Sequence, residues 1–140
     1  MAIPERSFQS EIIPRRLIDL RSPVQERANM MVDLSVMSRH VGISISKKLA
    51  RFGVNYNLWQ VLVTLWGGHA VTPAAVAQHL QVEAATISRY LDQLETAGYI
   101  SRERSKADRR VVDIVITPKG EKVVKAGLKE LDDVSKKLST

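Results

Sequence analysis

The fold follows mainly from one part of the chain, residues 71–117, which reads VTPAAVAQHLQVEAATISRYLDQLETAGYISRERSKADRRVVDIVIT. A cap residue followed by proline, at 72–73, predicts the start of a short helix that continues to about Leu80. Only two or three residues separate it from a second helix, which is expected to end near Ala97. The first half of the stretch therefore predicts two short helices joined by a tight turn.

The second helix, which begins at Glu83 or Ala84, is predicted to have one buried and one exposed face. Ile87, Leu91 and Leu94 recur at helical spacing, so they are expected to point into the core. The outward face is then expected to carry Ala85, Thr86, Arg89, Asp92, Gln93 and Thr96, with Ser88 on its flank.

After Gly98, which supplies a helix stop, the periodicity changes. Residues 99–105 and 110–117 are rich in β-formers, and they predict a hairpin with a polar turn at 105–109. The span 101–112 holds five basic and two acidic side chains, a local charge of +3, which is half of the chain's net +6. Two short helices followed by a basic hairpin predict a mainly α fold with a small β-hairpin wing, a winged helix-turn-helix.

Further helices are predicted on both sides of this unit. A long amphipathic helix is expected to begin at Ser22 and Pro23 and to end at Gly53, and Asn57 is expected to cap a helix that ends near Trp66. The core residues of the latter helix are expected to be Trp59, Leu62, Val63 and Trp66. The last helix opens at Thr117 and Pro118, and its apolar seam is Val124, Leu128, Leu131, Val134 and Leu138.

The composition bounds the class of protein. A chain of 140 residues with 44% apolar residues fits one domain, and its net charge of +6 favours an acidic partner. The absence of cysteine excludes disulfides, thiolate nucleophiles, zinc–thiolate sites and thiol-based switching. Residues 1–16 contain no apolar run typical of a secretory signal, so the cytoplasm is the expected location. Residues 52–82 carry no Asp, Glu, Lys or Arg, but polar residues and a proline interrupt them, which indicates buried helices and no membrane span.

Neither an enzyme nor a cofactor is expected. His40, His69 and His79 fall on different segments and form no metal-binding pair. Asp132 and Asp133 are neighbours, which places them about 100° apart on a helix, so they cannot act as an acid–base pair.

The predicted surface suits double-stranded DNA. Small side chains at the start of the second helix let its backbone approach base edges, where Arg89 can offer a bidentate fork to guanine and the Thr86 methyl group suits thymine. A basic hairpin tip can enter a minor groove, with Asp108 aiming a neighbouring arginine. The candidate contacts are Ala85, Thr86, Ser88, Arg89 and Gln93 on the helix and Arg102, Arg104, Lys106, Asp108, Arg109 and Arg110 on the wing.

Five segments carry a family resemblance: LWQVL at 58–62, VAQHLQV at 76–82, TISRYLDQLETAG at 86–98, YISRERSKADRRV at 99–111 and ITPKGEK at 116–122. With them, residues 57–122 resemble the MarR family of bacterial and archaeal transcription regulators. The most specific feature is the Asp-x-Arg signature at Asp108 and Arg110, correctly spaced between Gly98 and the helix start at 117–120.

The resemblance implies a prokaryotic, nucleoid-associated homodimer that acts as a repressor. Its two recognition helices would enter successive major grooves of a pseudo-palindromic operator, with half-sites about 10 bp apart. Arg89 matches the family's recognition-helix arginine, and Asp108 matches the aspartate that positions a minor-groove arginine at Arg110, with Arg109 as a second candidate. The implied dimer contacts are Met30, Leu34, Met37, Val124, Leu128, Leu131 and Leu138.

The same resemblance divides the chain into an N-terminal arm (1–21), a long dimerisation helix and connection (22–56), the winged helix-turn-helix (57–117) and a C-terminal dimerisation helix (118–140). Many family members release DNA when a small aromatic or phenolic effector binds between the dimerisation and DNA-binding regions. That site would involve the long first helix and the helix of Trp59, but no residue of this sequence identifies a ligand.

Three departures from the family pattern stand out. Gln81 replaces a glycine in the turn, Glu83 replaces a Ser or Thr cap, and only 23 residues follow Thr117, so one dimerisation helix is missing or shortened. The apolar residues of the arm, Phe8, Ile12, Ile13, Leu17, Ile18 and Leu20, are expected either to cross onto the partner subunit or to fold back on their own.

A second function stays open at this point. In a winged-helix assembly module, the second helix would meet another protein instead of a groove, with weak or no DNA binding. Glu83, Asp92 and Glu95 on or beside that helix favour this alternative, whereas Arg89 and the basic wing favour DNA.

Overall fold

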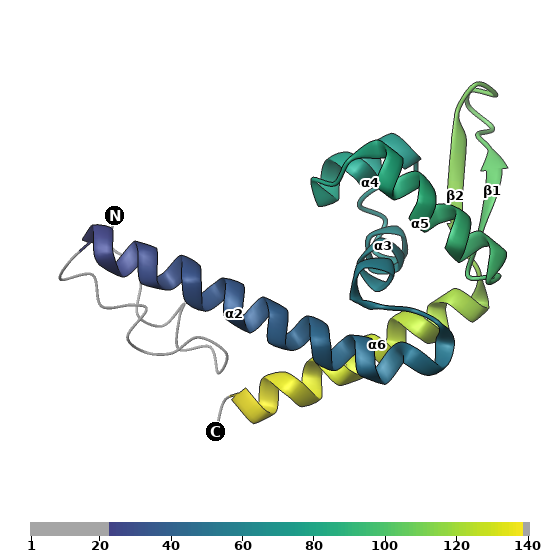
Figure 1. Ribbon diagram of the computed structural model, residues 1–140. Helices are drawn as coiled ribbons and strands as arrows, with labels where there is room; N and C mark the ends of the chain where they lie inside the picture. Colours follow the sequence, from purple (N-terminus) through teal and green to yellow (C-terminus); the bar gives the residue numbers. More distant parts are fainter. Residues whose placement is uncertain (1–22, 139–140) are drawn as a thin grey trace.

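The computed structural model describes residues 23–138, and the predicted arm at 1–21 lies outside them. Figure 1 shows a mainly helical chain with one hairpin. Its elements are α2 (Pro23–Leu49), the 3-10 turn η2 (Ala50–Phe52), α3 (Tyr56–Trp66), α4 (Pro73–Leu80), α5 (Ala84–Thr96), β1 (Ile100–Arg104), β2 (Val112–Ile116) and α6 (Pro118–Leu138). The element order confirms the predicted winged helix-turn-helix between flanking helices.

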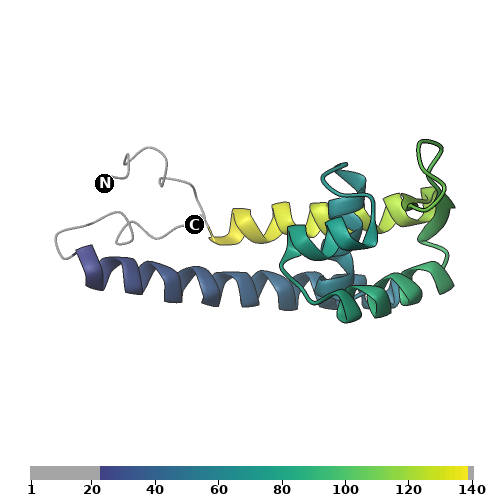
Figure 2. The same cartoon turned by 90° about the horizontal axis from the view of Figure 1, so that it is seen from above.

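The two long helices form one layer, and the small elements stand on it. α2 contacts α6, and α3 contacts both of them and also α4 and α5 (Figure 1). The view from above shows α2 and α6 side by side, with α3, α4, α5 and the hairpin gathered at one end (Figure 2). In both views the N-terminal half of α2 extends away from that end, so it adds nothing to the core around α3.

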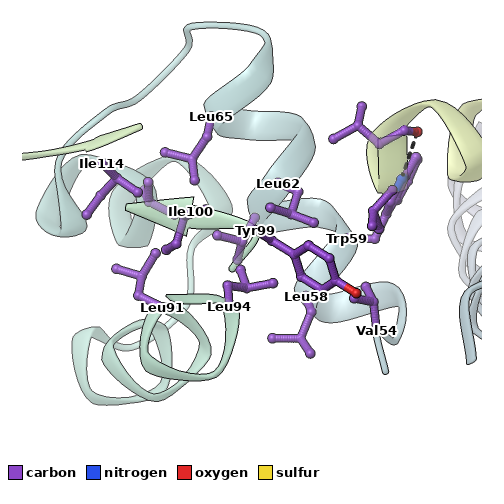
Figure 3. Close-up of a cluster of buried hydrophobic side chains, with 14 of the residues drawn as sticks. Val54, Leu58, Trp59, Leu62, Leu65, Leu91, Leu94, Tyr99, Ile100 and Ile114 are labelled. Carbon is purple, nitrogen blue, oxygen red and sulfur yellow. Dashed lines mark hydrogen bonds between the residues drawn. The ribbon is translucent and has the colours of Figure 1, made fainter. Parts of the chain in front are cut away.

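The core lies where α3 meets the helix pair and the hairpin. Leu62 of α3 is fully buried, and Ile87, Leu91 and Leu94 of α5 are 0–1% exposed, as their spacing predicts. Figure 3 shows Leu91 and Leu94 with Leu58, Leu62 and Leu65 of α3 and with Tyr99, Ile100 and Ile114 of the hairpin region. Burying these apolar side chains holds α5 and the hairpin to α3, and each large buried side chain stabilises the fold by about 1.5–3 kcal/mol.

The two tryptophans of α3 behave differently. Trp59 is buried, donates from Nε1 to the carbonyl oxygen of Val124 at 3.2 Å, and fits against Gly127, where a Cβ would collide with its ring. The prediction that Trp66 belongs to the core is wrong, because its side chain is 42% exposed at the end of the helix. Trp66 is the last residue of α3, and the residues that follow it, 67–69, are exposed as well, so this end of the helix faces solvent.

The cap of α3 also differs from the prediction. Asn55, not Asn57, is the N-cap, and its Oδ1 accepts from the backbone N–H of Leu58 at 2.9 Å. The N–H of Tyr56 donates to Ser46 Oγ of α2 at 2.9 Å, so a neighbouring helix satisfies one of the free donors of the first turn. The predicted end of the first helix at Gly53 is confirmed, with a 3-10 turn as its last part and a φ of 71° at the glycine.

The hairpin is antiparallel, with a register from Ile100 opposite Ile116 to Arg104 opposite Val112. Ile100 and Ile114 point into the core, whereas Val115 is exposed, so neighbouring residues of β2 face opposite sides of the hairpin. The N–H of Ile114 donates to the carbonyl oxygen of Val71 at 2.6 Å, so β2 is tied to the residue that precedes the cap of α4. Among residues 23–138, no helix is long and apolar enough to cross a membrane.

Candidate nucleic-acid interface

The helix pair is built as the sequence predicts, with one strained residue. Thr72 caps α4 by accepting from the N–H of Ala75 at 3.2 Å. Gln81 then turns the chain in the left-handed conformation (φ 55°, ψ 46°), which favours glycine and costs energy for other residues. Glu83 precedes α5 and makes no side-chain cap hydrogen bond, so it leaves the free N–H groups of the first turn without a capping side chain.

The outward face of α5 is open for contact. Ala85, Ser88, Arg89 and Gln93 are exposed and Thr86 is half-buried, so the predicted recognition residues share one accessible face. Arg89 Nη2 donates to Thr86 Oγ1 at 3.3 Å, a long and exposed hydrogen bond that base edges can replace. The structure therefore brings together the residues predicted to read the major groove.

The tip of the wing is organised around Asp108 and Arg110. The Arg110 side chain donates from Nε to Asp108 Oδ1 and from Nη2 to Oδ2, both at 3.1 Å, and its backbone N–H donates to Oδ1 at 3.0 Å. The Arg110 side chain remains 90% exposed, so the carboxylate aims the guanidinium without burying it. These hydrogen bonds, from the side chain first and then the backbone of Arg110, hold the pKa of Asp108 below its usual 3.8.

Other contacts shape the same turn. Ser105 Oγ accepts from the N–H of Ala107 at 3.2 Å, and Arg104 Nη1 donates to the carbonyl oxygen of Arg109 at 2.8 Å. Arg104, predicted as a DNA contact, therefore also stabilises the turn through this exposed hydrogen bond. Lys106 and Arg109 are exposed at the tip, as expected for side chains that neutralise phosphates.

Arg102 has a different role from the one the sequence predicts. Its guanidinium lies 3.0 Å from Asp92 and 3.0 Å from Glu95, both on α5, so it is engaged within the chain. The same contacts account for two of the three acidic residues that favoured an assembly surface, because Asp92 and Glu95 are both neutralised by the wing, whereas Glu83 is not. Sequence reasoning missed this cluster, since its members come from two elements and no local motif joins them.

A second group of residues that the sequence did not reveal connects α5 and the hairpin to the long helices. The Tyr99 hydroxyl donates to the carbonyl oxygen of Phe52, the last residue of η2, at 2.6 Å. Thr117 Oγ1 donates to the carbonyl oxygen of Gly98 at 2.7 Å, and Lys119 Nζ donates to that of Ala97 at 2.8 Å. These bonds join the end of α5 and the start of β1 to α6 and to the end of the first helix.

Known proteins with similar sequences are HTH-type transcriptional regulators. A family model described as the MarR family matches residues 54–112. The HTH-type transcriptional regulator PrsX of Escherichia coli is 34% identical over 100 residues, which cover 70% of this chain and 60% of PrsX. The HTH-type transcriptional regulator PapX of Escherichia coli is 31% identical over 97 residues, which cover 67% of this chain and 59% of PapX.

Solved protein structures also superimpose on this chain. The crystal structure of AbfR of Staphylococcus epidermidis superimposes with a TM-score of 0.68 at 26% identity, covering 83% of this chain and 80% of that one. The chain belongs to the MarR family. A structure of reduced AbfR bound to DNA gives a TM-score of 0.62 at 27% identity, with 79% of each chain covered. The MarR-family resemblance and the winged-helix fold class predicted from the sequence are both confirmed.

The relatives limit what passes to this chain. It spans about 60% of the length of the curated relatives it matches. Both of those relatives are named as transcriptional regulators, which agrees with the prediction that this MarR-family chain is not an enzyme. Among residues 23–138, no group of three or more His, Asp or Glu side chains could hold a metal ion.

The predicted dimer residues of this MarR-family chain are divided by the structure. Met30, Met37, Leu128 and Leu131 are half-buried and Leu34 is 39% exposed, so part of each side chain is open to a partner. Val124 is fully buried in the core of its own chain, so it cannot contribute surface to a dimer. The side chain of Leu138 lies outside the described part.

Proposed function

We propose that this protein is a sequence-specific, double-stranded DNA-binding regulator of transcription, acting as a repressor. The observation that carries the proposal is the Asp108–Arg110 pair, which presents an exposed guanidinium at the tip of a wing whose strand β1 packs against α5. A cation held by a carboxylate and still exposed suits insertion into a minor groove, whose negative potential attracts arginine. The DNA-bound structure of the relative AbfR supports the same partner.

The homodimer is proposed from the surface of α2. Val24, Met31, Val32, Val36 and Ile43 are 49–75% exposed, which is unusual for a run of large apolar side chains along one helix. A second copy of the chain would cover this surface and place two recognition helices on one duplex. As a regulator of the chromosome, the dimer would act at the nucleoid in the prokaryotic cytoplasm.

A small aromatic or phenolic effector is proposed for the groove between α2 and α3. This groove has a volume of about 500 Å³ and is lined by residues that include Arg39, Ile43, Ser46 and Tyr56. A phenolic acid could place its ring on Ile43 and Tyr56 and its carboxylate near Arg39. We expect 4-hydroxybenzoate to change the tryptophan fluorescence of the wild type and not of Arg39→Ala; equal responses would place the ligand elsewhere.

The DNA proposal is tested by fluorescence anisotropy with a random-sequence duplex at two salt concentrations. The wild type is expected to bind with strong salt dependence, because each neutralised phosphate contributes a slope of about −0.9 in log affinity against log salt. The Arg89→Ala/Arg110→Ala variant should lose most of this binding. Lys125→Ala/Lys129→Ala removes two exposed cations from α6 and should keep it. No wild-type binding even at low salt would favour the protein-assembly alternative.

The single variants separate reading from positioning. Arg89→Ala is expected to cost about 1–3 kcal/mol on a selected operator and less on random DNA, because its fork reads a base. Arg110→Ala is expected to weaken binding to every duplex and to lower the salt slope by about one. Equal losses of Arg89→Ala on operator and random DNA would contradict base reading by this side chain.

A further inference from the structure

Arg102 links the two elements that the proposed function places on DNA. It lies in the middle of β1, and its 29% exposed side chain reaches α5, where Nη2 donates to Asp92 Oδ1 and Nη1 donates to Glu95 Oε1, each at 3.0 Å. Because two nitrogens of one planar guanidinium bind different carboxylates, its orientation is fixed. Within residues 23–138, these are the two ion pairs that join α5 to the hairpin.

The arrangement suits a brace better than a phosphate contact. The Arg102 side chain is less exposed than those of Asp92 and Glu95, which are 65% and 42% exposed, so the cation lies under its partners. Two carboxylates offset the charge of this guanidinium, so a phosphate at its remaining N–H groups would also meet the negative charges of Asp92 and Glu95. If the guanidinium instead left these partners for a phosphate, two unpaired acids would remain on α5.

We propose that Arg102 is a positioning residue, which fixes the angle between α5 and the wing and thereby sets how well the protein discriminates its operator from random DNA. The inference rests on the proposed DNA-binding function. A recognition helix in a major groove and a wing tip in the neighbouring minor groove form their contacts together only when the two elements keep the spacing of the grooves. Random DNA is held mainly through phosphates, which tolerate a less rigid wing.

The test compares affinities for an operator, selected from a random duplex library, and for a random duplex. Arg102→Gln removes the brace and is expected to lower the ratio of operator to random affinity about five- to tenfold, the size of a coupled pair of contacts. The salt slope should stay unchanged, because no phosphate contact is lost. Lys125→Gln removes one exposed cation from α6 and should leave the ratio unchanged.

The acidic partners provide a test that keeps Arg102 in place. Asp92→Asn/Glu95→Gln removes two negative charges, so electrostatics alone would raise affinity for both duplexes. A brace predicts instead that affinity for random DNA rises while the operator-to-random ratio falls. The charge-swapped pair Arg102→Glu/Asp92→Arg should recover most of the ratio, since it restores one ion pair across the same two elements.

Two results would overturn the proposal. A salt slope lowered by about one in Arg102→Gln would show that the guanidinium neutralises a phosphate. A parallel rise of both affinities in Asp92→Asn/Glu95→Gln would show that the acids only repel DNA. If Arg102→Gln melts before binding can be measured, the acid variant, in which the arginine is intact, decides. Absence of salt-dependent binding by the wild type would instead refute the proposed function itself.

Discussion

At the scale of single residues, Gln81 holds a conformation that glycine adopts without strain. Its φ of 55° lies in the left-handed region, and it is the only non-glycine residue with positive φ among residues 23–138. We predict that Gln81→Gly raises the free energy of unfolding by about 1 kcal/mol, because relief of strain exceeds the added entropy of the unfolded chain. Urea denaturation measures the change.

A matched control lies three residues earlier. Gln78 is exposed within α4, where glycine is expected to lower the free energy of unfolding by about 1 kcal/mol. Opposite signs for the two Gln→Gly substitutions would confirm that the turn geometry, not the residue type, sets the effect. A loss of stability in both would contradict the assignment of strain to Gln81.

The Asp108–Arg110 pair has a defined pH dependence. Hydrogen bonds from Arg110 lower the pKa of Asp108 below its usual 3.8. A lowered carboxylate pKa gives stabilisation that is present above the unfolded-state pKa and is lost as the pH falls through the folded-state value. We therefore expect the Arg110 Nε–H resonance to stay constant from about pH 5 to pH 8 in the wild type, and to shift in Asp108→Asn. A wild-type titration with a midpoint above about pH 5 would contradict this pairing.

The two arginine clusters differ in how far the sequence could predict them. Asp108 and Arg110 are two positions apart in a tight turn, so their pairing follows from local geometry, and the prediction that the aspartate pairs with a neighbouring arginine is confirmed. Arg102 is seven and ten positions from its partners and belongs to another element. Its charge alone indicates phosphate binding, and only the packing of β1 against α5 reveals the ion pairs.

At the scale of elements, the N-terminus of α5 combines two opposing effects. Glu83 gives no side-chain cap, but its charge interacts favourably with the positive end of the helix dipole. A serine cap is worth about 1 kcal/mol and the exposed dipole interaction about 0.5, so Glu83→Ser is predicted to raise stability by about 0.5 kcal/mol. It should also raise DNA affinity, because a negative charge leaves the approach to the phosphates.

Glu83→Gln separates these two effects. It removes the charge without supplying a good cap, so stability should fall slightly while DNA affinity rises as much as in Glu83→Ser. Thermal melting ranks the stability of the wild type, Glu83→Ser and Glu83→Gln, and fluorescence anisotropy ranks their affinity for DNA. Equal DNA affinities in all three would show that the start of α5 lies away from the phosphates.

Helix positions in this chain follow from local patterns, whereas some boundaries depend on contacts between elements. Thr72 with Pro73 and the stop at Gly98 are local signals, and the helices they bound are confirmed. The start of α3 is different: asparagine at 57 predicts a cap there, but the asparagine at 55 takes this position. Ser46 of α2 accepts the Tyr56 N–H, and this contact between distant residues favours the earlier start.

At the scale of the whole molecule, the exposed apolar surface of α2 explains why the sequence predicts the bounds of this helix but not which neighbour each of its sides contacts. Val41, Ile45 and Leu49 face the chain's own core, whereas Val32, Val36 and Ile43 are exposed on another side of the same helix. Apolar residues on several sides weaken the amphipathic signal, and they are typical of a helix that contacts more than one neighbour. One sequence cannot show which side belongs to the partner.

The hydrogen bonds that join α5 and the hairpin to the long helices lead to the last prediction. The Tyr99 hydroxyl, bonded to the Phe52 carbonyl, connects the start of the wing to the end of the first helix. In the proposed dimer, this connection helps to fix the separation of the two recognition helices. Tyr99→Phe is expected to lower the free energy of unfolding by about 1 kcal/mol, since one hydrogen bond is lost and the carbonyl is exposed to little water.

The same variant should also bind its operator less selectively, because less strictly held recognition units match the half-site spacing less well. Tyr90→Phe is the matched control, because it removes the same hydroxyl group from a half-buried tyrosine of α5. Anisotropy with the selected operator and with one whose half-sites are moved one base pair apart measures the effect. Tyr99→Phe should reduce the preference for the original spacing and Tyr90→Phe should not; equal preferences in the two variants would mean that other contacts set the separation.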